Sequence, residues 1–61
     1  MPHYEICYRN EDGSLAAKFT TPCPDDKRAK ILAHAMKSRE HKALEVWDGD
    51  TLVYERPDRG H

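Results

Sequence analysis

The segment from Pro22 to Glu40 constrains the fold most, because it is the one stretch whose apolar residues recur with helical spacing. Asp25 and Asp26 lie where a helix dipole favours negative charge, and Pro24 suits a first helical position, which needs no backbone N–H. At about 100° per residue the segment has an apolar arc and a basic arc. The apolar arc contains Ala29, Leu32, Ala33 and Met36, widened by Ile31 and Ala35, and the basic arc contains Lys27, Lys30, His34 and Lys37. We therefore expect one amphipathic helix.

A β-hairpin precedes this helix. Apolar residues alternate with polar ones on both sides of Asp12-Gly13, which is the pattern of two half-buried strands. An Asp-Gly pair at this place predicts a two-residue type I′ turn. That turn would oppose Tyr8 to Ala17 and Ile6 to Phe19, so that apolar residues meet on one face.

A second strand pair, residues 42–47 and 51–56, follows the helix around Asp48-Gly49. A two-residue loop would oppose Leu44 to Val53, whereas a three-residue loop with a left-handed Gly49 would oppose Leu44 to Leu52. We prefer the three-residue loop because it places four apolar residues on one face. These are Leu44, Val46, Leu52 and Tyr54.

Together these elements predict an α+β fold: a four-stranded antiparallel sheet (ββαββ) with one helix packed on one face, in a single domain of residues 1–56 with a tail of residues 57–61. Strand order 2-1-3-4 makes every neighbour antiparallel, and order 2-1-4-3 remains open. The helix leaves the other sheet face uncovered. We expect that face to carry His3, Glu5, Cys7, Arg9, Ala16, Lys18, Thr20, Ala43, Glu45 and Val53, with Trp47 near its rim.

Composition limits what such a chain can do. With 61 residues, 38% of them hydrophobic and 34% charged, the chain is near the size at which a single core is marginal, so self-association would help it. The net charge of −1 gives no general attraction to nucleic acid or anionic lipid. No apolar run approaches the ~18 residues of a membrane span, and residues 1–5 do not resemble a signal peptide. We expect a cytoplasmic protein with no membrane association.

The sequence predicts no enzyme, cofactor or metal site. It has no nucleophile elbow and no phosphate-binding glycine loop, and its cysteines and histidines lack the close spacing of zinc ligands. The predicted register sets Cys7 opposite Lys18 and leaves Cys23 about 16 Å further along, beyond the ~7 Å that a disulfide spans, so we expect two reduced thiols. A small enzyme or a metal or redox protein centred on Cys23, beside the helix start, is a third and weaker hypothesis, because Asp25 and Asp26 disfavour a thiolate there.

Several short motifs are similar to those of a protein family. They are Tyr4-Glu-Ile-Cys-Tyr8, Glu11-Asp-Gly13, Asp25-Asp26 before an alanine-rich helix, Leu44-Glu-Val-Trp-Asp-Gly49 and Leu52-Val53. This pattern, over residues 4–56, resembles small uncharacterised alphaproteobacterial proteins of about 60 residues with a ββαββ pattern and a Glu-hydrophobic-Trp-x-Gly hairpin near the C-terminus. The resemblance implies the fold and implies no activity.

The functional hypothesis is a protein-interaction module that forms a homodimer or binds another protein. Contact would be through a sheet edge or the uncovered face, with Trp47, Val53 and Cys7 as candidate contacts. For Trp47, a place in the rim of the core explains the residue equally well. The alternative hypothesis is a nucleic-acid-binding protein that uses Lys27, Lys30 and Lys37, although a solvated helix face explains these lysines more simply.

Overall fold

The first strand, β1 (His3–Arg9), is one of the two inner strands of the sheet in the computed structural model, which describes residues 1–57. It pairs antiparallel with β2 (Leu15–Pro22) on one side and with β3 (Ala43–Asp48) on the other, and β4 (Thr51–Arg56) pairs with β3. The order β2-β1-β3-β4 confirms both the α+β fold and the preferred strand order. Tyr4, Ile6 and Tyr8 of β1 point to the same face of the sheet and are buried there in one cluster with Ala29 and Ala33 of the helix.

The only helix among residues 1–57, α1 (Asp26–Ala35), is shorter than the predicted segment of residues 22–40. Pro22 ends β2, and Pro24 precedes the N-cap instead of opening the helix. Asp25 is the N-cap, and its side chain accepts a hydrogen bond from the Arg28 N–H at 2.8 Å. The helix therefore starts where a short acidic side chain can satisfy one of its first N–H groups.

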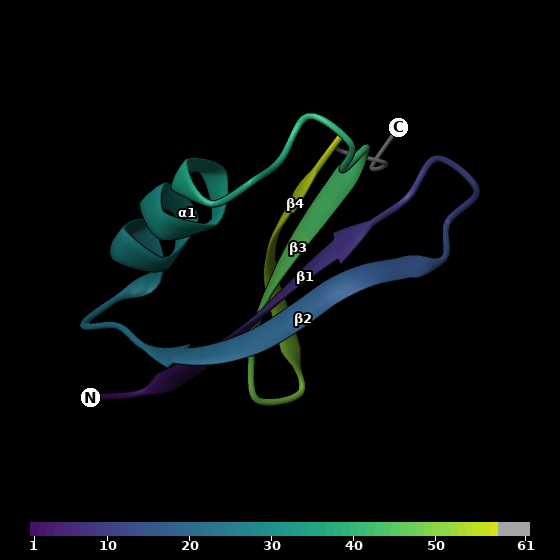
Figure 1. Ribbon diagram of the computed structural model, residues 1–61. Coiled ribbons are helices and arrows are strands. Elements are labelled where there is room, and N and C mark those ends of the chain that lie inside the picture. The colour runs from purple at the N-terminus through teal and green to yellow at the C-terminus, as the bar shows by residue number, and fades with distance from the viewer. Residues whose placement is uncertain (58–61) are drawn as a thin grey trace.

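The helix α1 lies beside the strands (Figure 1), and two of its alanines face the core. Ala29 and Ala33 are fully buried and contribute to a core that includes Ile6, Leu44 and Val46. Two tyrosines of β1 also bind the helix: the Tyr8 hydroxyl donates to the Ala33 carbonyl, and the Tyr4 hydroxyl donates to Asp26 Oδ1 at 2.6 Å.

The helix is rotated relative to the predicted arc. Ile31 and Met36, both expected to face the sheet, are 53% and 54% exposed. Lys30, expected to face water, is half-buried with its Nζ 5.2 Å from the Tyr54 ring centre. His34 is exposed as expected, but its Nε2 lies 2.6 Å from the Tyr54 hydroxyl. The prediction was wrong for Lys30 because an aromatic side chain of β4 supplies a partner for this flank of the basic arc.

The first hairpin has the predicted register but a different turn. Tyr8 pairs with Ala17 and Ile6 with Phe19, as predicted. However, the Gly13 N–H donates to the Asn10 carbonyl and the Asn10 N–H to Ser14, so the loop has three residues, with Gly13 at φ 88°. A register shift between Tyr8 and Arg9 then leaves Ala16 as an extra residue, and this bulge restores the predicted pairing. The type I′ prediction was therefore wrong.

The second hairpin differs from both predicted registers. Asp48 pairs with Thr51 around a two-residue Gly49-Asp50 loop, with Gly49 at φ 62°, and Leu44 pairs with Arg56. Tyr54 lies opposite Val46, which confirms its place on the helix side of the sheet. Leu52 lies opposite Trp47 and is 38% exposed, so its predicted core position was wrong.

Candidate functional site

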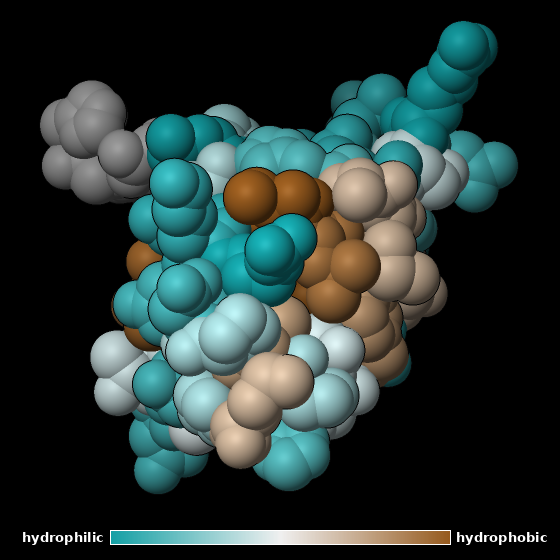
Figure 2. Space-filling view, turned by 90° about the vertical axis from the view of Figure 1, so that its left-hand side faces the viewer, coloured by the Kyte–Doolittle hydropathy of each residue, from teal (hydrophilic) through white to brown (hydrophobic). Residues whose placement is uncertain are grey.

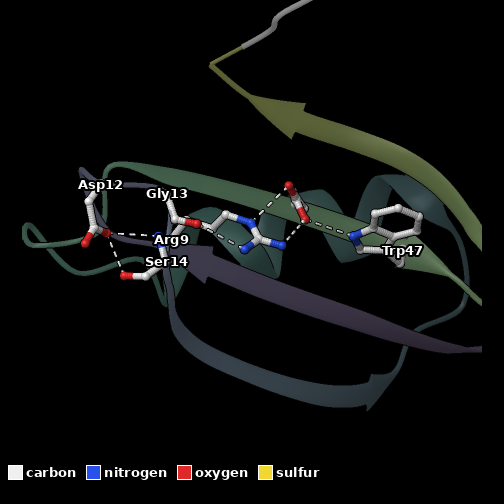
Figure 3. A network of polar contacts seen from close by, with 6 residues as sticks. Arg9, Asp12, Gly13, Ser14 and Trp47 are labelled. Atoms are coloured by element: carbon white, nitrogen blue, oxygen red, sulfur yellow. Dashed lines mark hydrogen bonds and ion pairs between the residues drawn. The ribbon is translucent and has the colours of Figure 1, made fainter.

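The sheet face turned away from α1, which we call the open face, carries a connected polar network (Figure 3). Glu45 of β3 is its centre. Arg9 of β1 donates to both oxygens of the Glu45 carboxylate, from Nε to Oε2 at 3.3 Å and from Nη2 to Oε1 at 3.5 Å. The Trp47 indole N–H also donates to Glu45 Oε1, at 3.1 Å. Arg9 also donates to the Gly13 carbonyl at 3.3 Å, which connects the network to the first turn. The open face is therefore organised by side chains that bind one another.

Cys7 lies inside this open face but is only 5% exposed. Burial raises the pKa of the Cys7 thiol, and the nearby Glu5 and Glu45 carboxylates raise that pKa further. A buried protonated thiol is a poor nucleophile and offers little surface to a partner. Cys23 is also a free thiol and is 2% exposed.

The candidate contact Val53 does not share a face with Trp47. The register shift between Val46 and Trp47 makes Val53 the extra residue of a bulge, and its side chain packs against the core cluster. The expectation that Val53 lies on the open face was wrong, because the sequence does not mark the bulge. Of the three candidates, Trp47 alone is both on the open face and half-buried rather than buried.

The edge strand β2 is the most exposed element of the sheet. Phe19 and Thr21 are half-buried and its other residues are exposed. Among residues 1–57, no strand pairs with the outer side of β2, which runs along the edge of the sheet in Figure 1. Such an edge can accept a further strand.

The ladder shows which peptide groups of β2 point outward. The Cys23 N–H donates to the Pro2 carbonyl at 3.0 Å, so residues 2 and 23 form a hydrogen-bonded pair. Hydrogen-bonded and non-hydrogen-bonded pairs alternate in an antiparallel ladder. Phe19 and Thr21 therefore turn their peptide groups toward β1, and Lys18 and Thr20 turn theirs toward the outer side.

Apolar side chains lie next to this edge. Phe19 packs against the core from the helix side of β2, with its ring centre 6.2 Å from that of Tyr8, and it stays half-buried. Figure 2 shows brown and tan atoms gathered on the side of the molecule that carries α1, with hydrophilic teal atoms around them. Edge and apolar surface together form the candidate site, which we call the β2 edge and define as residues 17–21.

Sequence reasoning named no residue of this edge as a site. The predicted order 2-1-3-4 already placed residues 15–20 outermost, and this was the signal that could have found them. What the sequence could not show is that α1 lies toward β3 and β4, which leaves Phe19 partly uncovered.

The three lysines of the alternative hypothesis have different surroundings. Lys30 is half-buried beside Tyr54, and Arg56 lies near the same ring, 4.8 Å from its centre. Lys27 is exposed on α1, and Lys37 lies past the helix end, where its Nζ is 3.5 Å from the Ser38 carbonyl.

Within residues 1–57, no group of three or more His, Cys, Asp or Glu side chains is arranged to hold a metal ion. The helix of this part of the chain is too short and too polar to cross a membrane. Of the predicted tail of residues 57–61, residues 58–61 lie outside the described residues.

Comparison of the chain with protein-family models, with curated proteins and with solved structures finds no match in any of the three. The resemblance to small alphaproteobacterial proteins therefore stays a prediction.

Proposed function

We propose that this chain is a protein-interaction module that forms a homodimer by pairing the β2 strands of two copies. The observation that carries the proposal is the exposed edge itself: the peptide groups of Lys18 and Thr20 point outward, and no strand of residues 1–57 covers them. Pairing would satisfy these groups and bury apolar surface that a small core leaves exposed.

The open face supports association less well than the edge does. Cys7 is buried, Val53 belongs to the core side, and Arg9 and the Trp47 indole N–H are already bound to Glu45. A partner on this face would have to displace or desolvate these polar contacts, which costs free energy. Trp47 remains the candidate contact there.

A proline at residue 20 tests the proposal. The Thr20 N–H points away from β1, so Thr20→Pro removes an outward donor and leaves the ladder with β1 intact. The matched control is Thr20→Ala, which keeps the N–H. Circular dichroism and tryptophan fluorescence check that both variants fold.

Light scattering over a range of concentrations gives the result. We expect the wild type and Thr20→Ala to reach twice the mass of the chain, and Thr20→Pro to keep the mass of one chain. A wild type that stays monomeric at every concentration would overturn the proposal, and so would a Thr20→Pro variant that dimerises as strongly as the wild type.

The same variants separate the proposal from its alternative. Nucleic-acid binding would be salt-dependent, would survive Thr20→Pro and would be lost when Lys27, Lys30 and Lys37 are changed to Glu. That set of results would favour the nucleic-acid-binding protein.

A further inference from the structure

We infer that the two β2 strands of the proposed homodimer meet in a single register, with Phe19 of one copy directly opposite Phe19 of the second copy of this chain. The inference rests on the proposed function and adds the geometry of the interface. It follows from two observations: the residues of β2 whose peptide groups point outward, and the residue pairs that each register would form.

The outward peptide groups restrict the choice. In an antiparallel pair, residues that turn their peptide groups toward each other form the hydrogen-bonded pairs. On the outer side of β2 these residues are Lys18 and Thr20, while Pro22 has no N–H to donate. Symmetric pairing can thus oppose Lys18 to Lys18, Lys18 to Thr20, or Thr20 to Thr20.

Charge and packing decide among these three registers. The Lys18–Lys18 register sets two lysines directly across from each other, which is destabilising. The Thr20–Thr20 register sets Lys18 against Pro22 and Phe19 against Thr21. Hydrogen bonds are then lost at the proline, and the aromatic ring meets a small polar side chain. The Lys18–Thr20 register sets Lys18 of each copy against Thr20 of the other, so that the outward N–H and C=O groups of both residues are paired.

This second register also makes an aromatic pair. Phe19 turns its peptide group toward β1, so Phe19 and its symmetry mate form a non-hydrogen-bonded pair, the type in which side chains approach most closely. Phe19 lies on the helix side of the sheet, so both α1 helices would lie on the same side of one continuous sheet. The half-buried ring of each copy would then complete the apolar cover of the other.

Charge substitutions at residue 20 report the register. In the proposed register Thr20→Glu places a carboxylate opposite Lys18 of the other copy at two symmetric positions, so the dimer Kd should fall roughly twofold to tenfold. Thr20→Lys places like charges there and should raise Kd by a similar factor. The Thr20–Thr20 register predicts weaker dimers for both variants, and the Lys18–Lys18 register predicts little change for either.

The same two substitutions should change the stability of the folded monomer in the opposite direction to the stability of the dimer. The two effects can therefore be measured separately. Thr20 lies opposite Glu5 of β1, so Thr20→Glu sets two carboxylates across from each other and Thr20→Lys adds an opposite charge. Thermal unfolding of the dilute monomer measures this effect by itself. If the Thr20→Glu dimer has a lower Kd although its monomer is less stable, the added binding free energy must come from the interface.

Disulfide trapping gives a second and independent readout. Mixing Ala17→Cys with Thr21→Cys chains should produce a cross-linked heterodimer under mild oxidation, because residues 17 and 21 are opposite each other only in the proposed register. Mixtures of Phe19→Cys with Ala17→Cys, or of Phe19→Cys with Thr21→Cys, report the Lys18–Lys18 and Thr20–Thr20 registers respectively. The wild type is the control, since Cys7 and Cys23 are buried.

The outcomes distinguish the inference from the proposed function. Cross-linking of residues 17 and 21 together with a tighter Thr20→Glu dimer is the expected result. A dimer that is broken by Thr20→Pro but cross-links in another register would overturn the inference and leave the proposed function standing. A monomeric wild type would overturn both.

Discussion

At the scale of single residues, the open face depends on one buried acid. Glu45 is 8% exposed and lies between Arg9 and Trp47, both of which donate to its carboxylate. Acceptors in such a position are costly to remove, because their donors lose a partner in a place that water reaches poorly. Glu45 thus contributes to the open face both as a hydrogen-bond acceptor and as a negative charge.

Substitution of Glu45 should separate these two contributions. Glu45→Ala leaves the Trp47 N–H and Arg9 without this acceptor, and we expect a loss of about 1–3 kcal/mol in the free energy of unfolding. Glu45→Gln keeps an oxygen that can accept from Trp47 and loses only the charge beside the half-exposed Arg9, so the loss should be smaller, below about 1 kcal/mol. Urea unfolding measures both. Equal losses for the two variants would show that charge alone matters.

Tyr4 predicts a dependence of stability on alkaline pH. The hydrogen bond from its hydroxyl to Asp26 raises the pKa of Tyr4 from its ordinary value of 10.0 to about 12, with burial and the Asp26 charge acting in the same direction. Because the folded pKa is the higher one, this contribution to stability is complete below pH 10.0 and is lost as pH rises to about 12.

Asp26→Asn is the variant that tests this assignment. It removes the carboxylate, so the pKa of Tyr4 should move back toward 10.0 and the alkaline loss of stability attributable to Tyr4 should shrink. Tyrosinate absorbance during a pH titration follows the ionisation. An unchanged titration in Asp26→Asn would contradict the role given to the hydrogen bond between Tyr4 and Asp26.

At the scale of elements, much of the fold follows from local pattern, and the errors occur where two elements meet. Alternation around Asp12-Gly13 predicted the pairs Tyr8–Ala17 and Ile6–Phe19, although a longer loop and a bulge at Ala16 replace the predicted turn and cancel in register. In the second hairpin no such cancellation occurs, so both predicted registers were wrong.

The rotation of α1 has the same origin. Periodicity gives the width of an apolar arc but cannot say which part of it the sheet will contact, and Tyr54 attracts Lys30 and His34 to one flank. For the same reason the sequence could not predict that Phe19 of β2 would be left partly uncovered.

Substitutions on α1 should confirm this rotation. Ala33 is fully buried against the sheet, so Ala33→Leu should overpack the core and cost about 1–3 kcal/mol of stability. Ile31 is 53% exposed, so Ile31→Lys should change stability by less than about 0.5 kcal/mol. Chemical denaturation of the two variants is the measurement. If Ile31→Lys were the more damaging change, the arc predicted from periodicity would be the correct one.

At the scale of the whole molecule, the helix and the sheet leave two different surfaces. The open face is occupied by charged side chains that bind one another, including a second ion pair in which Lys18 Nζ lies 3.5 Å from Glu5 Oε2. The β2 edge instead presents outward peptide groups beside a half-buried aromatic ring. Lys18 on this edge and Pro22 at its end disfavour indiscriminate strand addition, which is consistent with the proposed pairing in one register.

Amide hydrogen exchange, resolved by residue with NMR over a range of protein concentrations, tests the central claim most directly. The amides of Lys18 and Thr20 should exchange rapidly in dilute solution and become protected as the concentration rises, whereas the Phe19 amide, bound to β1, should be protected throughout. Exchange at Lys18 and Thr20 that does not change with concentration would contradict the account.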